Sequence, residues 1–223
     1  MRFLASNHFD FPDPSQADEQ GLLAIGGDLT AERLLTAYRM GIFPWFEPDC
    51  LPLWWSPNPR LILKPTHFKL SRSLKQSLKK PHHFSIDCAF SEVIAACASS
   101  PGRINHTWIT DEMQTAYNLL HDLGYAHSFE IWQDDQLSGG LYGISMGKAF
   151  FGESMFHRTR DSSKMAMYYL CATLQAWDFH FIDCQLPTEH LLSLGAEIIS
   201  RSEFLKLLKS ALEFPTRQGR WTT

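Results

Sequence analysis

The chain has 223 residues, with 20 Lys and Arg against 24 Asp and Glu and a formal net charge of −4. Its 44% hydrophobic and 20% charged residues are ordinary globular usage, which excludes disordered, collagen-like and coiled-coil classes. The acidic balance disfavours a protein that coats long stretches of nucleic acid, and it leaves room for a short contact with a phosphate backbone. Aromatic residues are in excess, with 7 Trp and 16 Phe, and this excess needs an explanation.

The cysteine and histidine spacings predict neither disulfides nor a metal site. The 5 cysteines are odd in number and form no C-x-x-C pair, so we expect reduced thiols, mostly in the core. The 10 histidines lack metal-ligand spacing with a third partner. Neither a secretory leader nor a run of about 18 to 20 apolar residues is present, so we expect a cytoplasmic protein without a membrane partner.

The first 64 residues are expected to form a small N-terminal domain. Asp28 or Thr30 can cap a helix over 31–40, which Gly41 ends. Six prolines follow within residues 42–65, and this density excludes long helices and central strands there. We therefore expect an irregular segment anchored by aromatic residues.

Residues 65–223 carry the pattern of an α+β domain, a mixed sheet flanked by helices. Helical signals cover 71–80, 87–98, 110–123, 162–177, 189–194 and 203–212. Strand signals cover 127–133, 136–145, 148–152 and 180–185, with a turn at Asp134 and Asp135.

Two groups of residues are open to either a structural or a nucleic-acid role. Arg72, Lys75 and Lys79 share one helix face with Lys80 beside them, which is either a solvated face or a phosphate contact. Four tryptophans in the first half either pack in the core or stack on the bases of a single-stranded RNA end. These tryptophans are Trp45, Trp54, Trp55 and Trp108.

Three polar residues in apolar strands are candidates for chemistry. Asp183 and Gln185 stand two apart, so an extended strand places both on one face, where they could orient a nucleophile. Gln185 cannot be a base, so its role would be positioning. The alternative is an Asp that caps a turn beside an exposed Gln. Glu153 is either a surface carboxylate at a strand end or a group turned into a cleft.

Eight short motifs, taken in order over nearly the whole chain, resemble the bacterial leucyl/phenylalanyl-tRNA–protein transferases. They are GLLAIGGDL (21–29), GIFPWF (41–46), LWWSPNPR (53–60), TWIT (107–110), AHSFEIW (126–132), GGLYGI (139–144), FFGESMF (150–156) and IDCQ (182–185). The resemblance implies a C-terminal domain of the GCN5-related N-acetyltransferase fold. It also implies transfer of Leu or Phe, and Met more weakly, from aminoacyl-tRNA to the α-amine of proteins that begin with Arg or Lys, which marks them for N-degron proteolysis.

Residue by residue, the resemblance implies a catalytic set of Asp183, Gln185 and Glu153. It places Trp45 and Trp108 around the terminal adenosine of the tRNA. The side-chain pocket of the family matches Leu141, Phe150, Gly152, Met167, Leu170 and Ile182, and its phosphate contact matches Arg72, Lys75, Lys79 and Lys80. Gln76 stands where a further cation is expected and Asn58 replaces the usual acid, so the sequence departs from the family pattern at both positions.

The implied partners are the acceptor end of Leu-tRNA or Phe-tRNA and a protein N-terminus, with no DNA. An aminoacyl ester is already activated, so neither a metal nor a cofactor is expected. We hypothesise that Asp183 and Gln185 orient or activate the α-amine while Glu153 holds the cationic N-terminus. The alternatives are a CoA-dependent N-acetyltransferase, although its pyrophosphate loop is not visible in 150–160, and a non-catalytic RNA-binding module.

Overall fold

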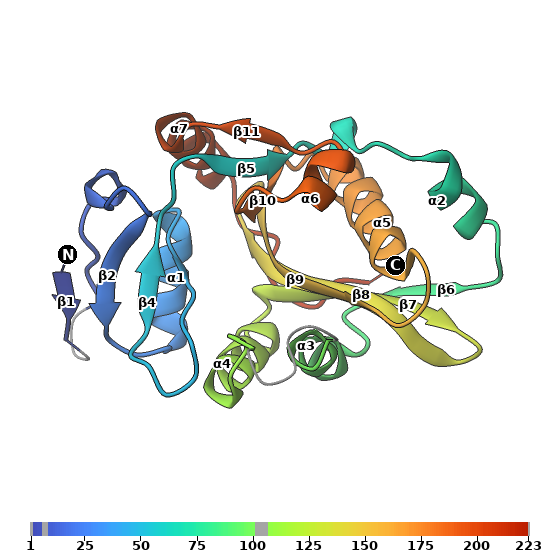
Figure 1. The fold of residues 1–223 in the computed structure, drawn as a ribbon, viewed down its shortest axis with the longest axis horizontal. Helices are drawn as coiled ribbons and strands as arrows, with labels where there is room; N and C mark the ends of the chain where they lie inside the picture. The colour runs from blue at the N-terminus through green and yellow to red at the C-terminus, as the bar shows by residue number, and fades with distance from the viewer. Residues whose placement is uncertain (1, 6–8, 101–106, 223) are drawn as a thin grey trace.

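The computed structural model describes residues 2–5, 9–100 and 107–222, and it contains a small and a large sheet with helices around them (Figure 1). The small sheet has the order β1-β2-β4-β3 and carries α1 against it. Its elements are β1 (Arg2–Leu4), β2 (Leu22–Gly26), α1 (Ala31–Arg39), β3 (Phe43–Pro44) and β4 (Leu53–Trp55), with a 3-10 turn at Pro14–Gln16.

The large sheet has the order β11-β5-β10-β9-β8-β7-β6, and β9 and β10 are a parallel pair within otherwise antiparallel neighbours. Its strands are β5 (Arg60–Leu63), β6 (His83–Ile86), β7 (Ala126–Gln133), β8 (Gln136–Met146), β9 (Ala149–His157), β10 (Phe181–Gln185) and β11 (Glu197–Ile199). This mixed α+β architecture, a sheet flanked by helices, is the one expected from the sequence.

Helices cover both faces of the large sheet (Figure 1). Helices α3 and α4 lie on one face, and α5, which connects β9 to its parallel neighbour β10, lies on the other. The helices are α2 (Arg72–Ser77), α3 (Phe90–Ala98), α4 (Asp111–Asp122), α5 (Ser162–Ala176), α6 (Glu189–Ser193) and α7 (Arg201–Leu212), with a 3-10 turn at Pro65–His67.

Local signals read from the sequence explain where these elements begin and turn. The hydroxyl of Ser71 accepts a hydrogen bond from the backbone amide of Leu74 at 3.2 Å, and that of Thr110 accepts one from the backbone amide of Met113 at 3.2 Å, so both side chains cap their helices. Asp134 and Asp135 have φ of 51° and 57°, the left-handed values that a two-residue hairpin needs. Helix α2 is shorter than expected and ends at Ser77.

The expectation of no central strand within residues 42–65 is wrong. Strand β5 is fully buried and pairs with both β10 and β11. Pro59 and Pro65 stand just outside it, so the four strand residues keep the amide donors that a central strand requires. The chain therefore enters the large sheet at Arg60, a few residues before the expected domain boundary at 64.

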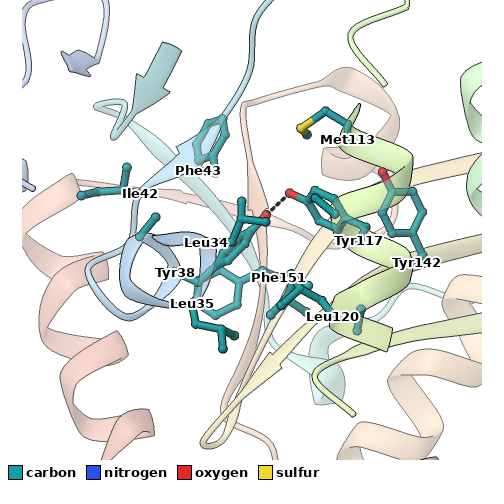
Figure 2. Close-up of a cluster of buried hydrophobic side chains, with 14 of the residues drawn as sticks. Leu34, Leu35, Tyr38, Ile42, Phe43, Met113, Tyr117, Leu120, Tyr142 and Phe151 are labelled. Atoms are coloured by element: carbon teal, nitrogen blue, oxygen red, sulfur yellow. Dashed lines mark hydrogen bonds between the residues drawn. The ribbon is translucent and has the colours of Figure 1, made fainter. Parts of the chain in front are cut away.

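The two parts of the chain share one hydrophobic core (Figure 2). Leu34 and Tyr38 of α1 lie in the same buried cluster as Tyr117 of α4 and Phe151 of β9. The rings of Tyr38 and Phe151 have centroids 5.1 Å apart. Helix α1 is consequently packed on the large sheet, and the Tyr38 side chain reaches toward the polar groups of β9.

Candidate functional site

A pocket of about 460 Å³ opens between the small sheet and the ends of β9 and β10. Its volume falls within the range of small-molecule sites, about 300 to 1,000 Å³. Nine residues selected from the sequence line it: Trp45, Trp108, Leu141, Gly152, Glu153, Met167, Leu170, Ile182 and Gln185. Residues from both halves of the chain thus meet at one cavity.

One wall of the pocket is apolar. Leu141 of β8, Met167 and Leu170 of α5 and Ile182 of β10 line it, and all four are buried. Phe150 is not among the residues that line the pocket: it is fully buried and in register with Ile182 on the neighbouring strand, so the two side chains lie side by side on one face of the sheet. Phe150, expected in the pocket surface, therefore supports the lining residue Ile182 from its side.

Two tryptophans edge the pocket. Trp45 is 42% exposed, and Trp108 is half-buried. The Trp55 indole donates to the carbonyl of Trp45 at 2.6 Å, and their ring centroids lie 5.6 Å apart. Trp45 is thus held by its neighbour while its ring stays accessible, as a stacking platform requires. Trp54, in contrast, is fully buried and belongs to the core.

A hydrogen-bonded carboxylate forms the polar corner of the pocket. The Gln185 amide donates to Oε1 of Glu153 at 3.0 Å, and the Tyr117 hydroxyl donates to Oε2 at 3.1 Å. Tyr38 is hydrogen-bonded in turn to the Tyr117 hydroxyl, the dashed contact of Figure 2. Burial raises the pKa of Glu153 to about 7, and the bonds from the tyrosines and Gln185 oppose this rise. Glu153 therefore lies in the cleft and titrates near neutral pH.

Asp183 is bound to Arg60 and does not line the pocket. Nε and Nη2 of Arg60 donate to its two carboxylate oxygens at 2.9 and 2.6 Å, and both side chains are fully buried. Asp183 Oδ1 also accepts a hydrogen bond from the backbone amide of Gln185 at 2.9 Å. This is the turn-capping arrangement that the sequence left open, and the adjacent Gln185 side chain points to Glu153.

The expected alternation of Asp183 and Gln185 on one strand face is wrong. The pairing register of β10 with β5 shifts between them, and Gln185 has a φ of 63°, in the left-handed region. The bulge turns the Gln185 amide toward the pocket while Asp183 stays against Arg60. Such bulges re-aim single side chains beside functional sites.

Arg60 connects several parts of the site. Its guanidinium carbon lies 4.9 Å from the ring centroid of Phe43 and 4.3 Å from that of Phe204. Phe43 itself lines the pocket. Arg60 consequently joins the small sheet, α7 and β10 around one buried charge, and the ring contacts add cation–π stabilisation.

The four cations selected on and beside α2 are all exposed: Arg72, Lys75, Lys79 and Lys80. Arg72, Lys75 and Lys79 line a shallow surface groove with Gln76. Helix α2 is tied to the start of α5 by the hydrogen bond from the Ser77 hydroxyl to Oδ2 of Asp161, 2.9 Å long. The cations thus project from a fixed helix into solvent.

Sequence reasoning missed Arg60, Tyr38 and Tyr117 as members of the site. A lone Arg opening the apolar run RLIL and a lone Asp in the apolar strand FIDCQ were available signals, because buried opposite charges need each other. The sequence positions of Tyr38 and Tyr117 indicated only that each belongs to the apolar face of a helix. Their hydroxyl contacts depend on the packing of α1 and α4 against β9, which no local pattern encodes.

The described residues contain neither a metal cluster nor a membrane-spanning helix. Over residues 2–5, 9–100 and 107–222, no group of three or more His, Cys, Asp or Glu is placed to hold a metal ion. Within the same residues, no helix is both long and apolar enough to cross a membrane. None of the 5 cysteines, all of which lie in the described ranges, forms a disulfide. Only Cys97 and Cys171 are buried, so the expectation that most lie in the core is wrong.

An apolar pocket that ends in a Glu–Gln pair, beside the parallel pairing of β9 and β10, is the kind of site in which an enzyme of mixed α+β fold binds a small substrate group. Residues 62–209 match the family profile described as leucyl/phenylalanyl-tRNA protein transferase, and residues 27–58 match the profile of its N-terminal domain. The chain belongs to the leucyl/phenylalanyl-tRNA protein transferase family.

Relatives in this family are similar over almost the whole chain. A leucyl/phenylalanyl-tRNA–protein transferase from Legionella pneumophila (strain Corby) is 60% identical, with 97% of each chain covered. One from Desulfatibacillum aliphaticivorans is 56% identical, with 99% of this chain and 95% of the relative covered. Among solved structures, a GCN5-related N-acetyltransferase from Kribbella flavida matches with a TM-score of 0.35 at 12% identity, over 74% of this chain and 60% of that chain.

Proposed function

We propose that this enzyme transfers a leucyl or phenylalanyl group, and a methionyl group more weakly, from aminoacyl-tRNA to the α-amine of proteins that begin with Arg or Lys. The observation that carries the proposal is the pocket itself. An apolar wall suited to Leu and Phe meets a carboxylate that is ionisable at neutral pH. A polar donor side chain would lose its hydrogen bonds to water against this wall, so the wall rejects it. The products enter N-degron proteolysis in the cytoplasm.

The reaction needs little beyond positioning. The neutral α-amine attacks the ester carbonyl of the donor, a peptide bond forms, and the ester C–O bond breaks. The ribose hydroxyl of the tRNA leaves and takes up the proton that the amine loses. An α-amine has a pKa of about 8, so a useful neutral fraction exists near pH 7. The ionised Glu153 attracts the cationic N-terminus of the acceptor. The side-chain amide of Gln185, which is hydrogen-bonded to Glu153, orients the amine.

Asp183 acts as a positioning residue in this proposal. Its carboxylate is occupied by Arg60 and by the Gln185 backbone, so it fixes the bulge that aims Gln185 into the pocket. Trp45 and Trp108 hold the terminal adenosine at the pocket edge, and the cations of α2 contact phosphates of the acceptor end.

The decisive experiment incubates the enzyme with Phe-tRNA labelled in the amino acid and a peptide that begins with Arg. We expect a labelled product carrying one added Phe. A peptide beginning with Ala is the matched acceptor control, and acetyl-CoA replaces the tRNA in a second arm. Acetylation of the peptide, or RNA binding without any product, would each overturn the proposed function.

Replacing Tyr117 by Phe is expected to move the acid limb of the pH–rate profile to higher pH. The hydroxyl stabilises the ionised form of Glu153, so its loss raises the pKa of that carboxyl above about 7. Activity should fall severalfold at pH 7 and recover toward pH 9. The measurement is kcat/KM from pH 5.5 to 9. Tyr169→Phe is the control: it removes from α5 a hydroxyl that is hydrogen-bonded to His82, and it should leave the limb in place. An unshifted limb in Tyr117→Phe would contradict the prediction.

Binding of tRNA is expected to depend only weakly on salt. Four cations lie on and beside α2, and each phosphate contact contributes about −0.9 to the slope of the logarithm of the association constant against the logarithm of the salt concentration. The slope should therefore be no steeper than about −4. Lys79→Gln should reduce the slope by about one. The measurement is a titration of labelled tRNA at several salt concentrations. Lys206→Gln, an exposed lysine on α7, is the control for charge alone, and a wild-type slope near −8 would show a larger footprint.

A further inference from the structure

The end of the described chain packs on the face of the large sheet that carries α5 (Figure 1). Trp221 is 2% exposed, and its ring stacks on His127 with centroids 3.6 Å apart. It meets Trp177 edge-on at 4.9 Å, beside the end of α5. Trp221 therefore belongs to the buried cluster that also contains the apolar wall of the pocket.

Hydrogen bonds hold Trp221 in this place from three sides. Its amide donates to Oδ2 of Asp87 at 2.8 Å, and its indole nitrogen donates to the carbonyl of Arg217 at 2.9 Å. The guanidinium of Arg220 donates to the carbonyl of Asp87 at 2.7 Å. The Asp87 carboxylate is itself fixed by the amide of Ser128 at 2.9 Å. The indole is thus anchored to the sheet and cannot slide away without breaking these bonds.

Trp221 contacts two phenylalanines that stand beside lining residues of the pocket. Its ring centroid lies 6.1 Å from that of Phe150 and 6.3 Å from that of Phe129. Phe150 is in register with Ile182, and Phe129 is in register with Leu141. Ile182 and Leu141 line the pocket. Contacts therefore run from the indole to the two phenylalanines, and from these to the lining residues beside them on the same face of the sheet.

We propose that Trp221 is a positioning residue that limits the size of the donor side chain, because it keeps Phe150 pressed toward the pocket wall. The inference rests on the proposed function. Protein interiors are close-packed, so a lining residue can shift only if its neighbours offer space. A smaller residue at 221 opens that space, Phe150 shifts into it, Ile182 can follow, and the pocket widens. Selection against large side chains is then set by contacts outside the pocket surface, through Trp221.

The test measures donor selectivity in Trp221→Leu and Trp221→Phe. Initial rates with Leu-tRNA, Phe-tRNA and Trp-tRNA, each with the same Arg-leading peptide, give three kcat/KM values per variant. We expect the ratio of tryptophanyl to leucyl transfer to rise about tenfold in Trp221→Leu, mainly through KM, and by a smaller factor in Trp221→Phe. General destabilisation lowers all three rates together and leaves their ratios unchanged.

Trp132→Leu is the matched control. Trp132 is a half-buried indole at the far end of β7, hydrogen-bonded to Ser85 at 2.8 Å, and its loss should leave the donor ratios at wild-type values. Donor ratios in Trp221→Leu that equal those of the wild type would overturn the inference. If Trp221→Leu does not fold, wild-type donor ratios in Trp221→Phe would overturn it instead. A wild-type enzyme that transfers from none of the three donors would instead refute the proposed function.

Discussion

Replacing Arg60 by Met is expected to lower the free energy of unfolding by about 3 to 5 kcal/mol, the cost typical of breaking one side of a buried ion pair. The substitution leaves the fully buried Asp183 carboxylate without its cation. Transfer activity should fall as well, because Asp183 is then no longer fixed in place and cannot hold the backbone amide of Gln185 in the bulge. Urea denaturation gives the first quantity and the peptide transfer assay the second.

A double-mutant cycle separates the pair from its surroundings. Arg60→Met with Asp183→Leu should cost less than the sum of the single substitutions, since it removes both charges together. Lys64→Met is the control, because Lys64 forms an ion pair with Glu197 in which both side chains are about 40% exposed. Its loss should cost less than about 1 kcal/mol. Equal costs for Arg60→Met and Lys64→Met would contradict the prediction, and Asp183→Asn with full activity and unchanged folding would remove Asp183 from the proposed site.

Replacing Glu153 by Gln is expected to reduce kcat/KM about 100-fold at pH 8, because the neutral amide no longer attracts the cationic N-terminus of the acceptor, and loss of one partner of a buried charge pair typically costs this much. The wild-type carboxyl has a pKa of about 7, so its ionised fraction rises through the neutral range. The ratio of wild-type to variant activity should therefore be small at pH 5.5 and reach a plateau above pH 8. The acceptor amine titrates equally in both enzymes, so the ratio isolates Glu153.

Stability provides the control for this substitution. The folded pKa of Glu153 is raised from 4.5 to about 7, so ionisation costs the folded state on the order of 3 kcal/mol. This cost is absent below pH 4.5, grows as pH rises and is complete above pH 7. Glu153→Gln should thus be as stable as wild type, or more stable, at pH 8. If it kept both the wild-type rate and the Arg or Lys preference, the role of Glu153 would be refuted.

Much of the fold could be predicted from local patterns. Helices α1, α4 and α5 and the hairpin of β7 and β8 follow from apolar periodicity, caps and the Asp134–Asp135 turn. Strand β5 could not, because its proline-rich surroundings argued against any central strand. The argument failed because proline affects only its own amide and its immediate neighbour, so four residues between prolines can still pair on both sides.

The site was predictable in its membership more than in its geometry. Glu153, Gln185 and both pocket tryptophans were named from sequence, and they converge on one cavity. The partner of Asp183 was not foreseen, since Arg60 lies 123 positions away in the sequence. The bulge at Gln185 was also not foreseen, because strand alternation assumes regular pairing. Contacts that depend on long-range packing leave no local trace.

The short passage from β4 to β5 bears on how substrates reach the active site. Only residues 56–59 separate the two strands, Pro57 and Pro59 stiffen this passage, and α1 is packed in the same core as α4 and β9. A hinge needs a segment free to absorb large dihedral changes, and this connection has none. We therefore expect the small sheet and the large sheet to keep their relative placement when the two reactants bind in the pocket between them.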